Sequence, residues 1–255
     1  MRVPFVAANW KMNKTVHEAL AYVEELREKV SDFNEVEIVI APPFTALHAV
    51  ASSLADTRIG VSGQDLHWKP KGAFTGEISA NMLKEAGAKY VIIGHSERRH
   101  LFDESNESVK SKIQAASDVE LISILCVGET LAEREAKQTF EILNKQLTEG
   151  LTGLHTLKSD RLIVAYEPIW AIGTGYNATP EQAQAAHAYI RSHLAKILGE
   201  VYAENCRIIY GGSVKPTNVD KLCVQVDVDG SLVGGSSLEA NSFAEIVARS
   251  HSATV

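Results

Sequence analysis

The sequence predicts a single-domain α/β protein, a closed (β/α)8 barrel over residues 1–255. The chain has 255 residues, 45% of them hydrophobic, which is enough for one large core and typical of one such barrel. Short apolar runs alternate with longer amphipathic segments throughout, a pattern typical of parallel β/α units. No low-complexity tract or Pro/Gly/Ser-rich linker divides the sequence.

Eight short apolar runs are predicted to be strands. Most are continuously apolar, as expected for parallel strands buried on both faces. In chain order they are Val3–Ala8, Val36–Ala41, Arg58–Gly63, Tyr90–Gly94, Leu121–Val127, Leu162–Tyr166, Arg207–Tyr210 and Ser231–Val233. Eight such strands, each followed by a helical segment, can close into a barrel. An open doubly wound sheet is the alternative, but no GxGxxG motif opens the first helix and the glycine-rich turns come late.

Helical spacing marks the segments between these runs. Apolar residues recur at helical intervals at Val16, Ala19, Val23, Leu26 and Val30, and again at Ala132, Ala136, Phe140, Leu143 and Leu147. Thr130 with Glu133 and Thr179 with Gln182 form capping-box patterns, the second with a proline at the first helical position. Gly87 is predicted to end a short helix over about 81–86.

Composition excludes several classes of function. The net charge of −7 argues against general nucleic-acid binding, which needs a broad basic surface. No apolar stretch approaches the length of a membrane helix, and no early segment resembles a signal peptide. Cys126, Cys206 and Cys223 lie far apart and suggest neither disulfides nor a zinc site. We therefore expect a soluble, cytoplasmic protein that uses no metal ion and no cofactor and binds no nucleic acid or membrane.

Polar residues that directly follow the predicted strands indicate the active site, because barrels of this kind build it at the carboxyl ends of their strands. Strands one, four, six, seven and eight are followed by unusual groups, which are Asn9-Trp10-Lys11, His95-Ser96-Glu97-Arg98-Arg99, Glu167-Pro168, Gly211-Gly212-Ser213 and Gly234-Gly235-Ser236. We expect all five to converge on one rim of the barrel.

Three side chains in these groups are candidates for chemistry. A desolvated Lys11 ammonium could stabilise a bound anion, although a lone lysine is more often a surface residue. His95 opens a short segment, Ser96 to Phe102, that could be helical, and the helix dipole would favour a neutral imidazole, although a structural histidine is the alternative. Burial would raise the pKa of the Glu167 carboxyl toward that of a general base.

The segment behind Glu167 is predicted to be a lid. Apolar residues after Pro168 would exclude water, and Gly173 and Gly175 permit unusual dihedral angles, whereas an ordinary surface loop is the alternative. The paired glycines after strands seven and eight favour phosphate binding through backbone N–H groups. A single Gly-Gly pair is more often a turn, but two pairs after consecutive strands are more specific.

Over nearly its whole length the chain resembles the triosephosphate isomerase family. The matching motifs are Ala8-Asn9-Trp10-Lys11-Met12-Asn13, Gly72-Ala73-Phe74-Thr75-Gly76-Glu77, Gly94-His95-Ser96-Glu97-Arg98-Arg99, Cys126-Val127-Gly128-Glu129, Tyr166-Glu167-Pro168-Ile169-Trp170-Ala171-Ile172-Gly173-Thr174-Gly175, Tyr210-Gly211-Gly212-Ser213 and Leu232-Val233-Gly234-Gly235. The resemblance implies the interconversion of dihydroxyacetone phosphate and D-glyceraldehyde 3-phosphate through an enediol intermediate, in glycolysis and gluconeogenesis.

The resemblance also implies a role for each candidate. Glu167 would be the base, His95 a neutral electrophile, and Lys11 and Asn9 would stabilise charge on the substrate oxygens, with Glu97 in support. The main-chain amides that would bind the phosphate belong to Gly173, Ser213, Gly234 and Gly235. The family further implies a homodimer in which the loop over 64–79, with Thr75 at its tip, inserts into the partner.

The chain departs from the family pattern at two places. After Gly175 the family most often has Lys-Thr-Ala, whereas this sequence has Tyr176-Asn177-Ala178. After Gly234-Gly235 the usual alanine is replaced by Ser236. We expect these differences to affect lid closure or the position of the base and not the identity of the catalytic groups.

Two other functions compete with this interpretation. Other phosphate-binding barrels, such as sugar-phosphate epimerases and isomerases of tryptophan or histidine biosynthesis, use similar glycine-rich ends of strands seven and eight. We do not expect them to share Lys11, His95 and Glu167. A barrel that has lost catalysis and serves in binding would lack an acid, base or electrophile, and none is missing from this sequence.

Overall fold

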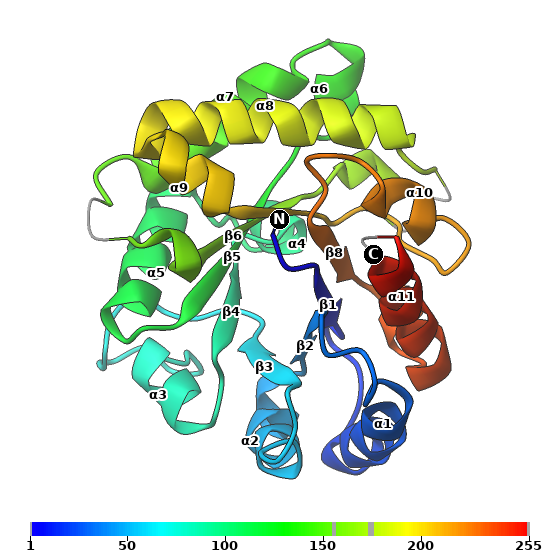
Figure 1. Cartoon of the computed structure of the whole chain (residues 1–255). Helices are drawn as coiled ribbons and strands as arrows, with labels where there is room; N and C mark the ends of the chain where they lie inside the picture. The colour runs from blue at the N-terminus through cyan, green and yellow to red at the C-terminus, as the bar shows by residue number, and fades with distance from the viewer. Residues whose placement is uncertain (1, 155–156, 173–175, 254–255) are drawn as a thin grey trace.

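The protein is a closed barrel of eight parallel strands. The structure, a computed structural model, describes residues 2–154, 157–172 and 176–253. The strands pair in chain order from β1 to β8, and β8 pairs with β1 to close the sheet. Figure 1 shows the strands in the centre and the helices around them. The predicted (β/α)8 barrel is confirmed, and the open doubly wound sheet is excluded.

Every predicted run is a strand, with ends that differ by no more than two residues from the prediction. The strands are β1 (Phe5–Asn9), β2 (Glu37–Ala41), β3 (Gly60–Gly63), β4 (Tyr90–Ile93), β5 (Ile122–Val127), β6 (Leu162–Tyr166), β7 (Arg207–Tyr210) and β8 (Gly230–Val233). Continuous apolar sequence predicts such strands well because both faces are buried, one against the barrel interior and one against the helices.

The helices surround the sheet. They are α1 (Val16–Lys29), α2 (Phe44–Ser53), α3 (Ala80–Glu85), α4 (Ser96–Leu101), α5 (Asn106–Asp118), α6 (Leu131–Glu135), α7 (Thr139–Leu151), α8 (Pro180–Leu198), α9 (Glu200–Asn205), α10 (Val219–Cys223) and α11 (Ala240–Ser252). Both predicted capping boxes are present, at Thr130 and Thr179. Gly87, at a φ of +100°, follows α3 as predicted. Within the described part of the chain, no helix combines the length and apolarity needed to cross a bilayer.

One helical pattern is interrupted. The spacing from Ala132 to Leu147 predicts a single helix, but the structure divides it into α6 and α7. Lys137 adopts a left-handed φ of +60°, and the N–H of Gln138 donates to the carbonyl of Glu133 across 2.8 Å. This is a helix-ending motif that usually has glycine at the left-handed position, so the lysine gave no sequence signal for the break.

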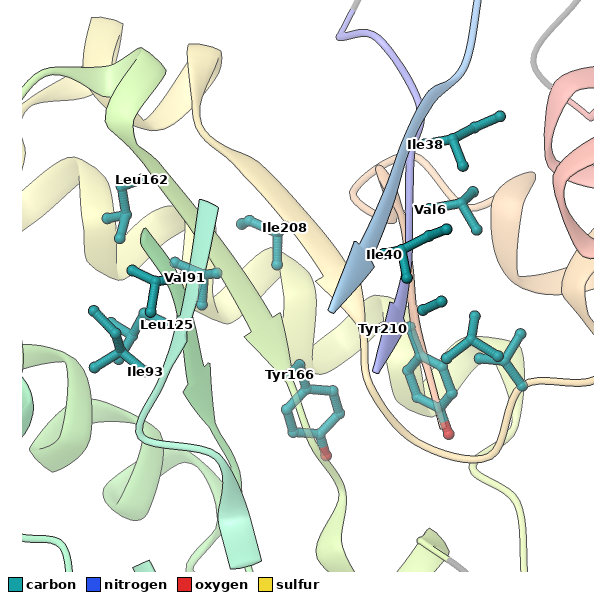
Figure 2. Close-up of a cluster of buried hydrophobic side chains, with 14 of the residues drawn as sticks. Val6, Ile38, Ile40, Val91, Ile93, Leu125, Leu162, Tyr166, Ile208 and Tyr210 are labelled. Carbon is teal, nitrogen blue, oxygen red and sulfur yellow. The ribbon is translucent and has the colours of Figure 1, made fainter. Parts of the chain in front are cut away.

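The strands carry two layers of buried side chains because successive residues point to opposite faces. Residues such as Ala7, Ile163 and Ile209 fill the barrel interior, and the opposite faces pack under the helices. Figure 2 shows part of this outer layer, including Val6, Ile40 and Leu125. Every second residue of β1, β6, β7 and β8 points into the barrel, and the next residues in these four series are Asn9, Glu167, Gly211 and Gly234. These residues therefore face the mouth of the barrel.

The opposite end of the barrel is closed by a polar and aromatic cluster. Tyr90 and Arg207 both donate hydrogen bonds to the carboxylate of Glu37. The Arg207 guanidinium lies 5.0 Å from the ring centroid of Phe5, and the rings of Phe5 and Tyr90 are 5.6 Å apart. The interior is therefore filled at the amino-terminal end of the strands.

Gly230 is expected to be essential for closing the sheet. Its φ of +142° is one that L side chains rarely adopt, and an added Cβ would lie 1.9 Å from the carbonyl oxygen of Phe5. We expect Gly230→Ala to lower the free energy of unfolding by about 2–4 kcal/mol and Tm by about 4–16 °C, measured by thermal denaturation. Gly150→Ala in α7 is the control, because its nearest new contact is 3.8 Å away and alanine favours helix. Equal shifts in both variants would contradict the prediction.

Candidate active site

A pocket of about 360 Å³ lies at the carboxyl ends of the strands. Its lining comes from the carboxyl ends of β1, β4, β6, β7 and β8 and from the loops that follow these strands, the five that the sequence singled out. The residues are Asn9, Lys11, His95, Glu167, Ile172, Gly211, Gly212, Ser213, Val214, Lys215, Leu232, Gly234, Gly235 and Ser236. The structure thus brings together every predicted catalytic and phosphate-binding residue except Gly173, which lies outside the described residues.

Glu167 is buried at the centre of this pocket with 2% of its surface exposed. One carboxylate oxygen lies 2.9 Å from Nε2 of His95, and the other accepts the backbone N–H of Ser96 at 2.9 Å. Two glycines make room for it, because a Cβ on Gly211 would lie 2.9 Å from its Cγ and one on Gly128 would collide with its carbonyl oxygen.

The surroundings of Glu167 decide its charge. Burial is the largest single effect and raises the pKa of its carboxyl, but His95, the Ser96 amide and Lys11 together outweigh burial, so the pKa lies below its ordinary value of 4.5. In this arrangement Glu167 is a carboxylate near neutral pH. In this arrangement the carboxylate is weaker as a base than catalysis near neutral pH requires.

One contact of His95 favours a neutral imidazole. His95 is the N-cap of α4, and its Nδ1 accepts the N–H of Glu97 at 3.2 Å, so the ring proton lies on Nε2 and points to Glu167. Burial lowers the pKa of His95, and the adjacent Glu167 carboxylate raises it above its ordinary value. Protonation at Nδ1 would break the bond from Glu97, so this bond opposes the effect of the Glu167 carboxylate and favours the neutral tautomer.

Lys11 occupies a strained backbone position near Glu97 and Glu167. Its φ is +53°, which is uncommon for a residue other than glycine. Asn9 accepts its N–H through Oδ1 at 3.0 Å, and Gln64 donates from Nε2 to its carbonyl at 2.9 Å. Its ammonium forms an ion pair with Glu97. The loop geometry therefore fixes the lysine while its partly exposed head remains in the pocket.

The loops after β7 and β8 supply backbone amides. Gly234 leads into a 3-10 turn, η3 (Gly235–Ser237), and a Cβ on Gly234 would lie 3.7 Å from Cε of Lys11. The amide of Ser213 donates to the carbonyl of Ala171 at 3.2 Å. Ser236, where the family usually has alanine, also lines the pocket.

The first part of the predicted lid is anchored at a buried carboxylate, Glu129. Pro168 is followed by a 3-10 turn, η2 (Ile169–Ala171). Trp170 donates its indole N–H to Glu129 at 3.0 Å, Tyr166 donates its hydroxyl at 3.1 Å, and Arg134 lies 3.1 Å away. Residues 173–175, at the centre of the predicted lid, lie outside the described residues, and Tyr176 beyond them is exposed.

Sequence reasoning missed two side chains that support the site. Gln64 follows β3 as directly as Lys11 follows β1, so the rule that polar residues after strands are functional applies to it as well. Glu129 belongs to a motif that carries the family resemblance but received no role. The amide of Ser96 gave no signal, because backbone donors are the same in every residue except proline. Among the described residues, no three His, Cys, Asp or Glu side chains are grouped so as to hold a metal ion.

Known proteins resemble this chain in sequence and in structure. The sequence profile of the family described as triosephosphate isomerase matches residues 4–250. Curated proteins of that name from Geobacter metallireducens and Pelobacter propionicus are 54% and 50% identical over 251 and 247 residues, covering 97% of this chain and 98% of each relative. The crystal structure of triosephosphate isomerase from Bartonella henselae has a TM-score of 0.88, with 40% identity over 97% of this chain and 99% of that one.

The lowered pKa of Glu167 predicts how acid affects stability. As pH falls through 4.5, the ordinary pKa, the carboxyl of the unfolded chain binds a proton while that of the folded protein is still charged. The charged carboxyl therefore makes a contribution to the free energy of unfolding above that pH. This contribution is lost as pH falls through the pKa of the folded protein. Glu167→Gln lacks the contribution. We therefore expect the Tm difference between the wild type and this variant to narrow between about pH 6 and about pH 3.

Thermal denaturation across that pH range measures the difference. Glu85→Gln, at an exposed position in α3, is the matched control, and its Tm difference from the wild type should change little. A gap for Glu167→Gln that stays constant with pH would show that the carboxyl is not stabilised in its charged form.

Proposed function

We propose that Glu167 is the catalytic base of this chain, which belongs to the triosephosphate isomerase family. The protein is an intramolecular aldose–ketose isomerase of glycolysis, and it interconverts D-glyceraldehyde 3-phosphate and dihydroxyacetone phosphate. The observation that carries the assignment is the convergence of a buried carboxylate, an imidazole and a lysine in one pocket. We extend the role to gluconeogenesis, because the isomerisation is reversible.

The proposed reaction is a proton transfer between neighbouring carbons. Glu167 removes a proton from the carbon next to the substrate carbonyl and returns it to the other carbon, by way of an enediolate. To reach that carbon the carboxylate must exchange its bonds to Ser96 and His95 for contact with substrate. Loss of those donors in a buried site raises the pKa of the carboxyl, which makes it the stronger base that the reaction needs.

His95, Lys11 and Asn9 would stabilise the charge that develops on oxygen. The Nε2–H of neutral His95 is placed to donate to a substrate oxygen once Glu167 moves, and it can pass that proton between the two oxygens. The Lys11 ammonium and the Asn9 side chain line the same pocket. Glu97 supports both groups, through its ion pair with Lys11 and its N–H bond to Nδ1 of His95.

The phosphate is proposed to bind the main-chain amides of Gly173, Ser213, Gly234 and Gly235. Three of these residues line the pocket, and Gly173 falls outside the described part of the chain. The Lys11 side chain passes close to Gly234, since a Cβ added there would lie 3.7 Å from Cε of Lys11. Closure of the lid over such a ligand would exclude water, which strengthens the electrostatic contacts and protects an enediolate from losing its phosphate.

A homodimer is proposed to form through the loop over 64–79. Residues 68–77 are all exposed. His67 at the base of the loop stacks on Trp68, with ring centroids 4.3 Å apart, and meets Phe74 at a tilt, with ring centroids 4.1 Å apart. Both partly exposed aromatic rings therefore contact one buried side chain. Met12, next to the catalytic lysine, is 95% exposed and Phe102 is 65% exposed. Exposed apolar groups gathered near a site are typical of an interface.

The cytoplasm is proposed as the location. All three cysteines are free and buried, which suits a reducing compartment.

Glu167→Gln is expected to remove turnover without removing phosphate binding. The amide keeps the shape of the side chain but cannot accept the proton. We expect kcat for glyceraldehyde 3-phosphate in a coupled assay to fall by at least about 10²–10⁴-fold, while the inhibition constant for inorganic phosphate changes little. Absence of turnover in the wild type would defeat the assigned function, and undiminished turnover in the variant would defeat the assigned base.

Thr75→Arg is expected to weaken the dimer, because it places a charge at the tip of the docking loop. Sedimentation velocity should show twice the mass of one chain for the wild type and a shift toward the single chain for the variant. Gln138→Arg, an equal change at the exposed start of α7, should leave the mass unchanged. A wild type that sediments as a single chain would contradict the proposal.

A further inference from the structure

The loop after β8 is tightly fixed on the side away from the pocket. We call residues Gly234–Leu238 the phosphate turn. Ser237 is fully buried, and both its N–H and its hydroxyl donate to the carbonyl of Gly234, at 2.8 and 2.7 Å. This carbonyl therefore has two donors that hold it in one direction.

Fixing that carbonyl also fixes the amide that can face a ligand. The carbonyl of Gly234 and the N–H of Gly235 belong to one planar trans peptide, so they point in opposite directions. Among the described residues, the N–H groups of Gly235 and Ser236 make no hydrogen bond to a partner. They are available to an anion in the pocket that these residues line.

Two side chains from the β1 side hold the rest of the turn. Tyr22 in α1 donates its hydroxyl to the carbonyl of Ser237 at 2.8 Å. Lys14 donates its ammonium to the carbonyl of Leu238 at 2.8 Å. Burial raises the pKa of Tyr22, so the hydroxyl stays protonated and remains a donor.

These two side chains are themselves packed together with the catalytic loop. Trp10, adjacent to Lys11, meets Tyr22 edge to face at 4.8 Å. The Lys14 ammonium lies 4.7 Å from the centroid of the Tyr22 ring and 5.4 Å from that of Trp10. Lys14 has a left-handed φ of +74°, a conformation that persists only where surrounding contacts hold it. The phosphate turn and the Lys11 loop are thus joined by one set of contacts.

We propose that Ser237, Tyr22 and Lys14 are positioning residues that aim the amides of the phosphate turn at the phosphate of the substrate. None of them lines the pocket, so each acts through the backbone of the turn. The proposal rests on the proposed function, in which Gly234 and Gly235 bind that phosphate. Because the same contacts join the turn to the loop of Lys11, they also set the separation between the phosphate and the reacting carbons.

Tyr22→Phe tests the proposal, because it removes only the hydroxyl. We expect the inhibition constant for inorganic phosphate and the KM for glyceraldehyde 3-phosphate to rise about three- to tenfold, the range for loss of one hydrogen bond. Turnover of glyceraldehyde, which lacks the phosphate, should not change. Tyr202→Phe is the matched control, since it removes a tyrosine hydroxyl that donates to the carbonyl of Lys158 at 3.2 Å, outside the pocket.

Ser237→Ala should also raise the inhibition constant for phosphate and the KM for glyceraldehyde 3-phosphate. If Ser237→Ala does not fold, Tyr22→Phe alone decides between the outcomes. Unchanged constants in Tyr22→Phe would overturn the proposal, as would equal changes in Tyr202→Phe or a parallel loss of glyceraldehyde turnover. A wild type that phosphate does not inhibit would instead refute the phosphate site itself, and the positioning role with it.

Discussion

Eight parallel strands can close on themselves only if alternate side chains fill the space that they enclose, and the rest of the molecule depends on this constraint. Gly230 allows β8 to approach Phe5 closely enough for closure. Below the mouth the interior is filled with aliphatic groups and ends in the cluster around Glu37. The same alternation carries Asn9, Glu167, Gly211 and Gly234 to the open end. The site is thus the continuation of the core, where polar groups and glycines replace aliphatic side chains.

Opposing electrostatic demands meet at Glu167. A buried carboxylate without partners would be costly, and Ser96 and His95 each supply a contact to it. Those partners stabilise the charge and lower the basicity of the group. The imidazole of His95 satisfies one of the two carboxylate oxygens. Gly211 leaves space beside the Glu167 side chain, and Gly128 leaves space for its backbone carbonyl.

The fold and most of the site could be predicted from the sequence for a physical reason. Strands buried on both faces leave continuous apolar runs, and the polar residues that follow them lie at one rim because the strands are parallel. The break at Lys137 was not predictable, since its left-handed conformation is set by contacts and not by residue type. Gln64 is positioned by its hydrogen bonds to the carbonyls of Lys11 and Ala41, both of which are far from it in sequence. Such partners are visible only when the chain is folded.

The bond from the Ser213 amide to the carbonyl of Ala171 has a consequence for affinity. One N–H with good geometry serves either the lid backbone or a phosphate oxygen. If phosphate takes this donor, as we propose, the ligand competes with a part of the protein for it. The apparent affinity is then weaker than the intrinsic affinity by the free energy of that bond, on the order of 1 kcal/mol. On that proposal, phosphate binding and the bond to Ala171 are thermodynamically linked, because each weakens the hold of the other on the same donor.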